Sequence, residues 1–252
     1  MSNHMFRILS IDFDFFQDAT EEQLHQYPDG IDLPTNLSSI VWASHYVGPG
    51  SELIKSVTIN KPLFQQMWRI LRHQSSDIPV LITNSHVHAY NFILEHYHQK
   101  TIDLYNVDMH HDMINNNPEL DCGNWIRCLK QEVPNTKIHW IARDVSMKCY
   151  HLAPNEIPVL LDFETIKDVE FDAIFLCRSD NWTPPHLDEY FHHMYTFCAS
   201  RFNDVKIQPD VAVPRDMKQL IEQEEQIRNT MKKFTNHITN KEDENHGHHG
   251  LC

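Results

Sequence analysis

Short apolar runs alternate with amphipathic segments along most of the chain, and this alternation constrains the fold more than any other feature. The runs are almost continuously apolar, as in strands that are buried on both faces of a sheet. Strands that alternate with helices predict an α/β three-layer sandwich with a mainly parallel sheet. We expect strands at residues 6–16, 78–83, 101–112, 137–142, 157–163 and 172–180, and helices at 61–75, 84–99, 122–132, 184–202 and 214–235.

The length of 252 residues suits one such domain, which we place at residues 1–238. Residues 239–252 are polar and rich in histidine, and we expect a disordered tail there. Residues 17–60 contain several turn signals and read as irregular. A loop of that size is usually functional or partly helical, so this segment is our candidate for substrate recognition.

Carboxylates and imidazoles gather where the expected strands end. In an open parallel sheet, ligands bind outside the carboxyl ends of the strands. Three of these ends carry dense polar clusters, and a fourth carries an arginine and an aspartate. The residues are Asp12 and Asp14, His86 and His88, Asp108, His110, His111 and Asp112, and Arg178 and Asp180.

The cluster Asp108-Met109-His110-His111-Asp112 has the pattern D-x-H-x-D. In an extended segment, alternate side chains point the same way, so its three ligating side chains could converge. Two carboxylates and an imidazole without a thiolate suit manganese, iron or zinc. A polar turn at a strand end is the alternative interpretation.

Asp12 and Asp14 form a D-x-D pattern among Ile11, Phe13 and Phe15. Their apolar neighbours would bury the two carboxylates, and burying an unpaired carboxylate is costly. A divalent cation would compensate; an exposed turn or pairing with an arginine are the alternatives. With His86, which alone could be a helix cap or a core residue, the clusters supply enough ligands for two metal ions.

These motifs resemble those of the arginase and ureohydrolase superfamily. SIDFDFF (10–16) and DMHHD (108–112) resemble its S-x-D-x-D and D-A-H-x-D signatures, and TNSHVHAYNF (83–92) resembles the segment of its first histidine ligand. GNWI (123–126) and RSDNWTP (178–184) are similar to a branch that includes peptide arginases, which convert arginine within precursor peptides to ornithine. The D-x-D motif follows D-x-H-x-D in ordinary arginases and precedes it here, which implies a permuted strand order.

The resemblance implies a hydrolase with two Mn²⁺ ions per chain that releases urea from arginine in a precursor peptide. By correspondence, Asp108 and Asp12 would bridge both ions, His86 and Asp112 would bind one ion, and His110 and Asp14 would bind the other. The family also has a carboxylate that holds the guanidinium group, for which Asp180 is our candidate. For the family's proton-transferring histidine, His111, His88 and His45 are candidates.

The charge and composition of the chain disfavour several other classes of protein. The formal net charge of −14 disfavours nucleic-acid binding and favours cationic ligands. No apolar run is long enough to span a membrane, and no secretory signal is visible. The six cysteines form no C-x-x-C pair, so we expect a reduced, cytoplasmic protein.

Two other functions remain open from the sequence. One is a single-zinc amide hydrolase of the related deacetylase type, which needs only two aspartates and one histidine. The other is a non-catalytic scaffold that binds a peptide or a metal. The six candidate ligands favour the dinuclear hydrolase over both. The oligomeric state stays undetermined.

Overall fold

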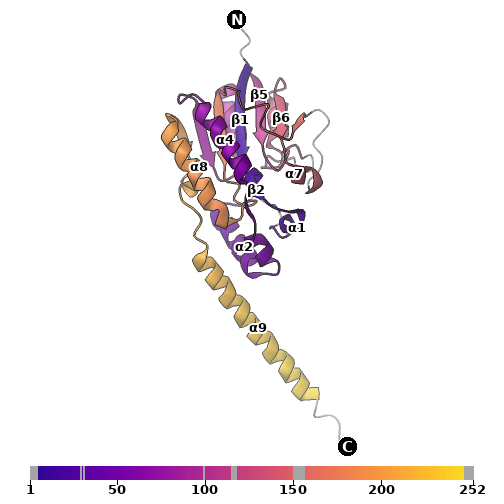
Figure 1. Cartoon of the computed structure of the whole chain (residues 1–252). Helices are drawn as coiled ribbons and strands as arrows, with labels where there is room; N and C mark the ends of the chain where they lie inside the picture. The colour runs from indigo at the N-terminus through magenta and orange to yellow at the C-terminus, as the bar shows by residue number, and fades with distance from the viewer. Residues whose placement is uncertain are drawn as a thin grey trace, which may run out of the picture.

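A seven-stranded parallel sheet forms the centre of the protein (Figure 1). Its strand order is β7-β6-β5-β1-β8-β4-β9. The computed structural model describes residues 5–246 except 29, 31, 99, 115–117 and 150–156. The strands are β1 (Met5–Asp12), β4 (Pro79–Thr83), β5 (Thr101–Val107), β6 (Lys137–Ile141), β7 (Val159–Leu160), β8 (Ala173–Cys177) and β9 (Asp204–Ile207).

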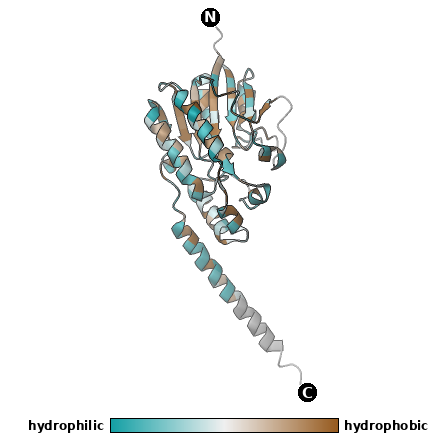
Figure 2. Cartoon of the chain, in the orientation of Figure 1, coloured by the Kyte–Doolittle hydropathy of each residue, from teal (hydrophilic) through white to brown (hydrophobic). Residues whose placement is uncertain are grey.

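Helices cover both faces of this sheet, which confirms the expected three-layer α/β architecture. The strand residues alternate between the layers: Leu9 and Ile11 of β1 pack in one core, and Ile8 packs in the other. Figure 2 shows hydrophobic residues concentrated in the strands. One core contains α4 (Lys61–His73) and α8 (Asp188–Arg201), and the other contains α5 (His88–Tyr97) and α6 (Trp125–Glu132).

The sheet topology places the motif-bearing strands side by side. β1 lies between β5 and β8, and Ile11 pairs with Val107 of β5 and with Leu176 of β8. β8 pairs in turn with β4. Because all four strands are parallel, the residues that follow them meet at one edge of the sheet. The D-x-D and D-x-H-x-D motifs are therefore neighbours in space although they are distant in sequence.

The segment 17–60, expected to be irregular, is largely structured. Trp42 and Tyr46 lie one helical turn apart and are buried together in a small core. The turn signals in this segment mark the breaks between short elements. These are β2 (Gln17–Asp18), α1 (Glu21–Leu24), α2 (Thr35–Val47), α3 (Ser51–Lys55) and β3 (Thr58–Ile59).

Several expected strands and helices have different limits. The first strand stops at Asp12, and η1 (Phe13–Phe16) follows it as a 3-10 helix. The third stops at Val107, and the fifth is reduced to the two residues of β7. β9 was not predicted because the sequence of this edge strand alternates charged and apolar residues. Also unpredicted were α7 (Asp144–Cys149) and η3 (Pro209–Val211), whereas η2 (Pro185–Leu187) forms the start of the helix expected at 184–202.

The last helix, α9 (Lys218–His246), runs past the tail boundary expected at residue 239. The sequence from 239 to 246 contains no glycine or proline, so nothing in it interrupts a helix. Residues 247–252, the rest of the expected disordered tail, lie outside the described residues. Within the described part of the chain, no helix is long and apolar enough to cross a membrane.

Candidate metal centre

The six candidate ligands converge at the carboxyl edge of the sheet. Five of them are buried, and the side chain of His110 is 20% exposed. The phenylalanines of η1 are also buried, so the apolar surroundings expected for the D-x-D carboxylates are present. Asp12 ends β1, Asp14 lies in η1, His86 follows β4, and Asp108, His110 and Asp112 follow β5.

Asp108 lies between two groups of side chains. Its Oδ2 is 3.0 Å from Nδ1 of His86, and its Oδ1 is 3.4 Å from Nδ1 of His110. Asp12 completes the first group, and Asp14 completes the second. In each group the candidate ligand atoms lie within 4.8 Å of one another.

With Asp112 added, the first group has three carboxylates around one imidazole nitrogen. His86 Nδ1 lies 3.2 Å from Asp12, 3.0 Å from Asp108 and 3.1 Å from Asp112, yet it makes no hydrogen bond of ordinary geometry. Donor atoms that share one ion at about 2.1 Å are about 3 Å apart when they stand at right angles to each other. The buried Asp and His side chains could therefore hold a metal ion.

The electrostatics of the cluster fit a cation as well. Burial and the charge of Asp108 raise the pKa of Asp12. Burial, with Asp12 and Asp108, raises the pKa of Asp14 to about 8, and the pKa of Asp112 is also raised well above its usual value. Burial alone would lower the pKa of His86, but its carboxylate neighbours raise it well above the usual value. The cluster thus retains protons that a divalent cation would replace.

Two residues at the site have left-handed backbone conformations. The φ angles are 51° at Asp112 and 58° at Ser179, and among the described residues these are the only non-glycine positive values. The segment after β5 is therefore curled rather than extended. The expectation that its ligating side chains converge because they alternate along an extended segment was wrong. Left-handed residues other than glycine are strained, and such strain is concentrated at functional sites.

Neighbouring side chains hold the candidate ligands in place. Trp125 Nε1 donates to Asp112 Oδ2 at 2.6 Å, and Asn106 Nδ2 donates to Asp108 Oδ2 at 3.2 Å. Ser179 Oγ donates to Asp12 at 3.0 Å, and Ser10 Oγ lies 2.7 Å from Nε2 of His86. The contact with Ser10 leaves Nδ1 of His86 directed at the carboxylates. Outer contacts of this kind orient ligands in metal sites.

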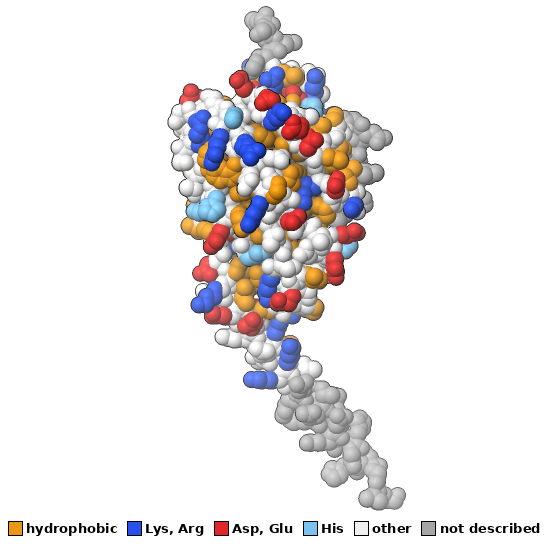
Figure 3. Space-filling view, in the orientation of Figure 1, with side chains coloured by type: hydrophobic (Ala, Val, Ile, Leu, Met, Phe, Trp, Pro, Cys, Tyr) orange, Lys and Arg blue, Asp and Glu red, His pale blue; other side chains and the backbone are white. Residues whose placement is uncertain are grey.

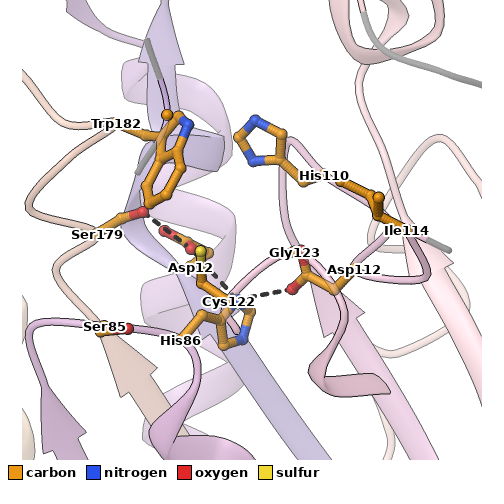
Figure 4. A pocket seen from close by; sticks show the side chains of 11 residues that line it. Asp12, Ser85, His86, His110, Asp112, Ile114, Cys122, Gly123, Ser179 and Trp182 are labelled. Atoms are coloured by element: carbon orange, nitrogen blue, oxygen red, sulfur yellow. Dashed lines mark hydrogen bonds and ion pairs between the residues drawn. The ribbon is translucent and has the colours of Figure 1, made fainter. Parts of the chain in front are cut away.

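A cavity of about 230 Å³ opens directly above the cluster (Figure 4). In Figure 4, His86 and Asp112 lie on one side of Asp12, and His110 and Trp182 lie on the other. Gly30 lies against the indole of Trp182, where an added Cβ would approach the ring to 2.8 Å. The other lining residues are Ser85, Ile114, Cys122, Gly123 and Ser179.

A second cleft of about 510 Å³ shares part of the wall of this cavity, including Trp182. Among the described residues that line the cleft, the charged ones are Asp32, Glu119 and Asp121, all acidic. The surface seen in Figure 3 mixes acidic and basic side chains. The cleft is therefore suited to a cationic ligand.

Sequence reasoning did not find Asp32, although it lies in the segment expected to recognise substrate. Its carboxylate accepts hydrogen bonds from Ser85 Oγ and from Asn181 Nδ2. Burial raises the pKa of Asp32, and the charges of Asp12 and Asp121 raise it further. No motif marks this residue, because its place beside the cavity results from the packing of the segment.

The four candidates for substrate binding and proton transfer are not among the residues that line the two cavities. Asp180 is buried, and Arg178 binds both of its oxygens, at 2.5 and 3.0 Å. Its carboxylate thus already holds a guanidinium group of this chain. His111 is buried against Trp140, and His88 begins α5. His45 Nδ1 lies 3.0 Å from the backbone oxygen of Gln26. The geometry therefore does not support direct substrate contact for these four residues.

No protein-family model, curated protein or solved structure matches this chain.

Proposed function

We propose that this protein is a metal-dependent hydrolase that cleaves the guanidinium group of arginine within a peptide to urea and ornithine. The observation that carries the proposal is the position of Asp108, whose two oxygens face separate Asp/His groups beneath the cavity. One group alone would be sufficient for a single-metal hydrolase, so the second group favours two ions.

Two Mn²⁺ ions per chain are part of this proposal. His86, Asp112, Asp12 and Asp108 would hold one ion, and His110 and Asp14 would hold the other together with the shared carboxylates. Oxygen and imidazole donors without a thiolate suit manganese. When bound, the ions would supply Lewis acidity and lower the pKa of water toward neutrality.

The chain's own residues would bind and orient the substrate. A guanidinium group that enters the acidic cleft can form paired hydrogen bonds with a carboxylate, and we assign this role to Asp32 in place of Asp180. Trp182 and Ile114 offer apolar surface to the aliphatic part of the arginine side chain. In the reaction, the oxygen of water bonds to the guanidinium carbon. The bond between that carbon and the side-chain nitrogen breaks, and the nitrogen leaves as a protonated amine.

A peptide substrate is supported by the motif resemblance and by the shape of the site. The cavity at the cluster is smaller than the acidic cleft, and the two share part of their walls. An arginine side chain could reach the cluster through the cleft while the peptide backbone stays outside.

The test combines metal content with product analysis. Metal-stripped protein would be reloaded with Mn²⁺ and incubated with an arginine peptide, free arginine and an acetyl-lysine peptide. We expect two ions per chain, urea release, and the mass loss of arginine conversion in the peptide. Asp108→Asn should lose both metal and urea release, whereas Asp168→Asn, a change at an exposed site, should keep them.

Other outcomes would contradict the proposal. One ion per chain with acetate release would support a deacetylase. A wild type that is fully loaded with manganese yet releases no urea from any arginine compound would exclude the guanidine hydrolase.

A further inference from the structure

The exposed part of α9 carries an apolar stripe that no other described part of the chain covers. Ile227, Met231 and Phe234 form this stripe, and they are 58%, 61% and 60% exposed. α9 extends away from the body of the protein along this part of its length (Figure 1). Neighbouring large apolar side chains exposed together on a helix usually mark an interaction surface.

The spacing of the stripe is that of a helix that pairs with another helix. Leu220, Ile227 and Phe234 are seven residues apart, and Met231 lies between the last two, as in the apolar positions of a heptad repeat. The stripe is also continuous with an existing interface, because Leu220 packs against the small core that contains Trp42. Beyond Arg228, which binds Ser44 of α2, the helix lacks this support.

Between Glu222 and Lys233, along the part of α9 that carries the stripe, charge changes sign near Arg228. Glu222, Glu224 and Glu225 precede this point, and Lys232 and Lys233 follow it. In Figure 3, basic side chains gather at the lower end of the coloured part of the helix. Two copies of α9 in parallel would bring like charges together, whereas an antiparallel pair would bring the acidic part of one helix beside the basic part of the other.

We propose that two copies of this chain associate through their apolar stripes, as an antiparallel pair of α9 helices centred near residue 229. In this arrangement Ile227 of one copy contacts Met231 of its partner, and the two-fold symmetry repeats the contact. Burial of the two stripes provides the affinity between the copies, and the charges favour the antiparallel over the parallel arrangement of the helices. The two bodies then lie at opposite ends of the helix pair. This inference does not depend on the proposed hydrolase activity.

The first test is the mass of the full chain in solution, measured by light scattering over a range of concentrations. We expect a particle of twice the chain mass of 29.8 kDa. Met231→Glu should reduce it to the single-chain mass, because the charge would be buried against Ile227 of the partner. Asn229→Glu adds the same charge on the opposite face of the helix and should leave the dimer intact.

The second test shows whether the two α9 helices run antiparallel or parallel. An antiparallel pair brings the two copies of residue 230 together and keeps the two copies of residue 223 far apart. Thr230→Cys should therefore form an intermolecular disulfide and Gln223→Cys should not, with wild type as the control for the natural cysteines. A single-chain mass for wild type at all concentrations, or a dimer that survives Met231→Glu, would overturn the proposal. Equal trapping at both positions would overturn the antiparallel arrangement.

Discussion

At the scale of single residues, the site depends on carboxylates that are buried close to one another. Asp12, Asp14, Asp108 and Asp112 share one small volume, and burial raises the pKa of three of them. Such an arrangement is unfavourable unless positive charge is supplied. Asp32 lies outside this group, at the wall of the cleft, so its role can be tested without removing a metal ligand.

We expect Asp32→Asn to weaken substrate binding while the metal content stays unchanged. A hydrogen bond to a charged group contributes about 1.5–3 kcal/mol, which corresponds to a rise in KM of roughly 10–100-fold. Steady-state urea release from an arginine peptide would measure KM, and elemental analysis would count the metal. An unchanged KM would show that Asp32 does not bind the guanidinium group.

The left-handed backbone at Ser179 gives a prediction about stability. Both Ser179→Gly and Ser179→Ala remove the hydrogen bond to Asp12, but only glycine tolerates a φ of 58° without steric strain. The glycine variant should be more stable than the alanine variant by about 1–2 kcal/mol. Chemical denaturation of the two variants would measure the difference, and equal stabilities would argue against backbone strain at this position.

At the scale of elements, a buried ion-pair network joins the loop after β8 to the segment before α9. Arg215 binds both oxygens of Asp188, at 2.9 and 2.6 Å, and also the backbone oxygens of Asp180 and Thr183. Arg178 binds Asp180 from the other side. The RSDNWTP motif therefore has a structural role in this chain: it positions the left-handed Ser179 and the cavity residue Trp182.

Removal of one partner from this network should be strongly destabilising. Arg215→Met removes the guanidinium group that binds both oxygens of the buried Asp188 carboxylate and leaves Arg178, 3.8 Å away, as its cationic neighbour; we expect a loss of about 3 kcal/mol in the free energy of unfolding. Adding Asp188→Asn should recover part of the loss, which a double-mutant cycle would show. Lys167→Met, which breaks an exposed ion pair with Glu164, should leave stability almost unchanged. Similar losses of stability in Arg215→Met and Lys167→Met would contradict a stabilising role for the buried network.

At the scale of the whole molecule, the stability of the fold should depend on both pH and metal binding, because both act on the Asp/His cluster. The pKa of Asp14 is raised to about 8, against about 3.9 for an unfolded aspartate. A group whose pKa is raised by folding stabilises the folded state at pH values below its unfolded pKa. This stabilisation is lost as the pH rises through its folded pKa. The raised pKa values of Asp12, Asp112 and His86 act in the same direction.

In a chelator, we therefore expect Tm to fall as pH rises from about 4 toward 8. At pH near 8, Mn²⁺ at a hundred times its Kd should add about 2.7 kcal/mol, or roughly 5–10 °C in Tm. Thermal unfolding with and without Mn²⁺ would measure both effects, and Asp14→Asn should flatten the chelator curve. A Tm in chelator that rises over this pH range would contradict the expectation.

The fold class and the chemistry at the strand ends could be predicted from the order of the residues alone. Apolar runs report which segments are buried on both faces, because burial depends on the local pattern of side chains. The same runs end at Asp12, His86 and Asp108, so the candidate ligands could be identified before their positions were known. The helices within residues 17–60 were missed because short elements between turn signals carry too little periodic pattern.

Which of these residues meet depends on the arrangement of the strands and segments in space. The insertion of β1 between β5 and β8 places Asp12 beside Asp108, and packing of the segment before α2 brings Asp32 to the cleft. The same packing turns Asp180 toward Arg178 and away from the cavity. Contacts of this kind join residues far apart in the chain. They depend on the packing of whole elements against one another, which no local pattern of the sequence records.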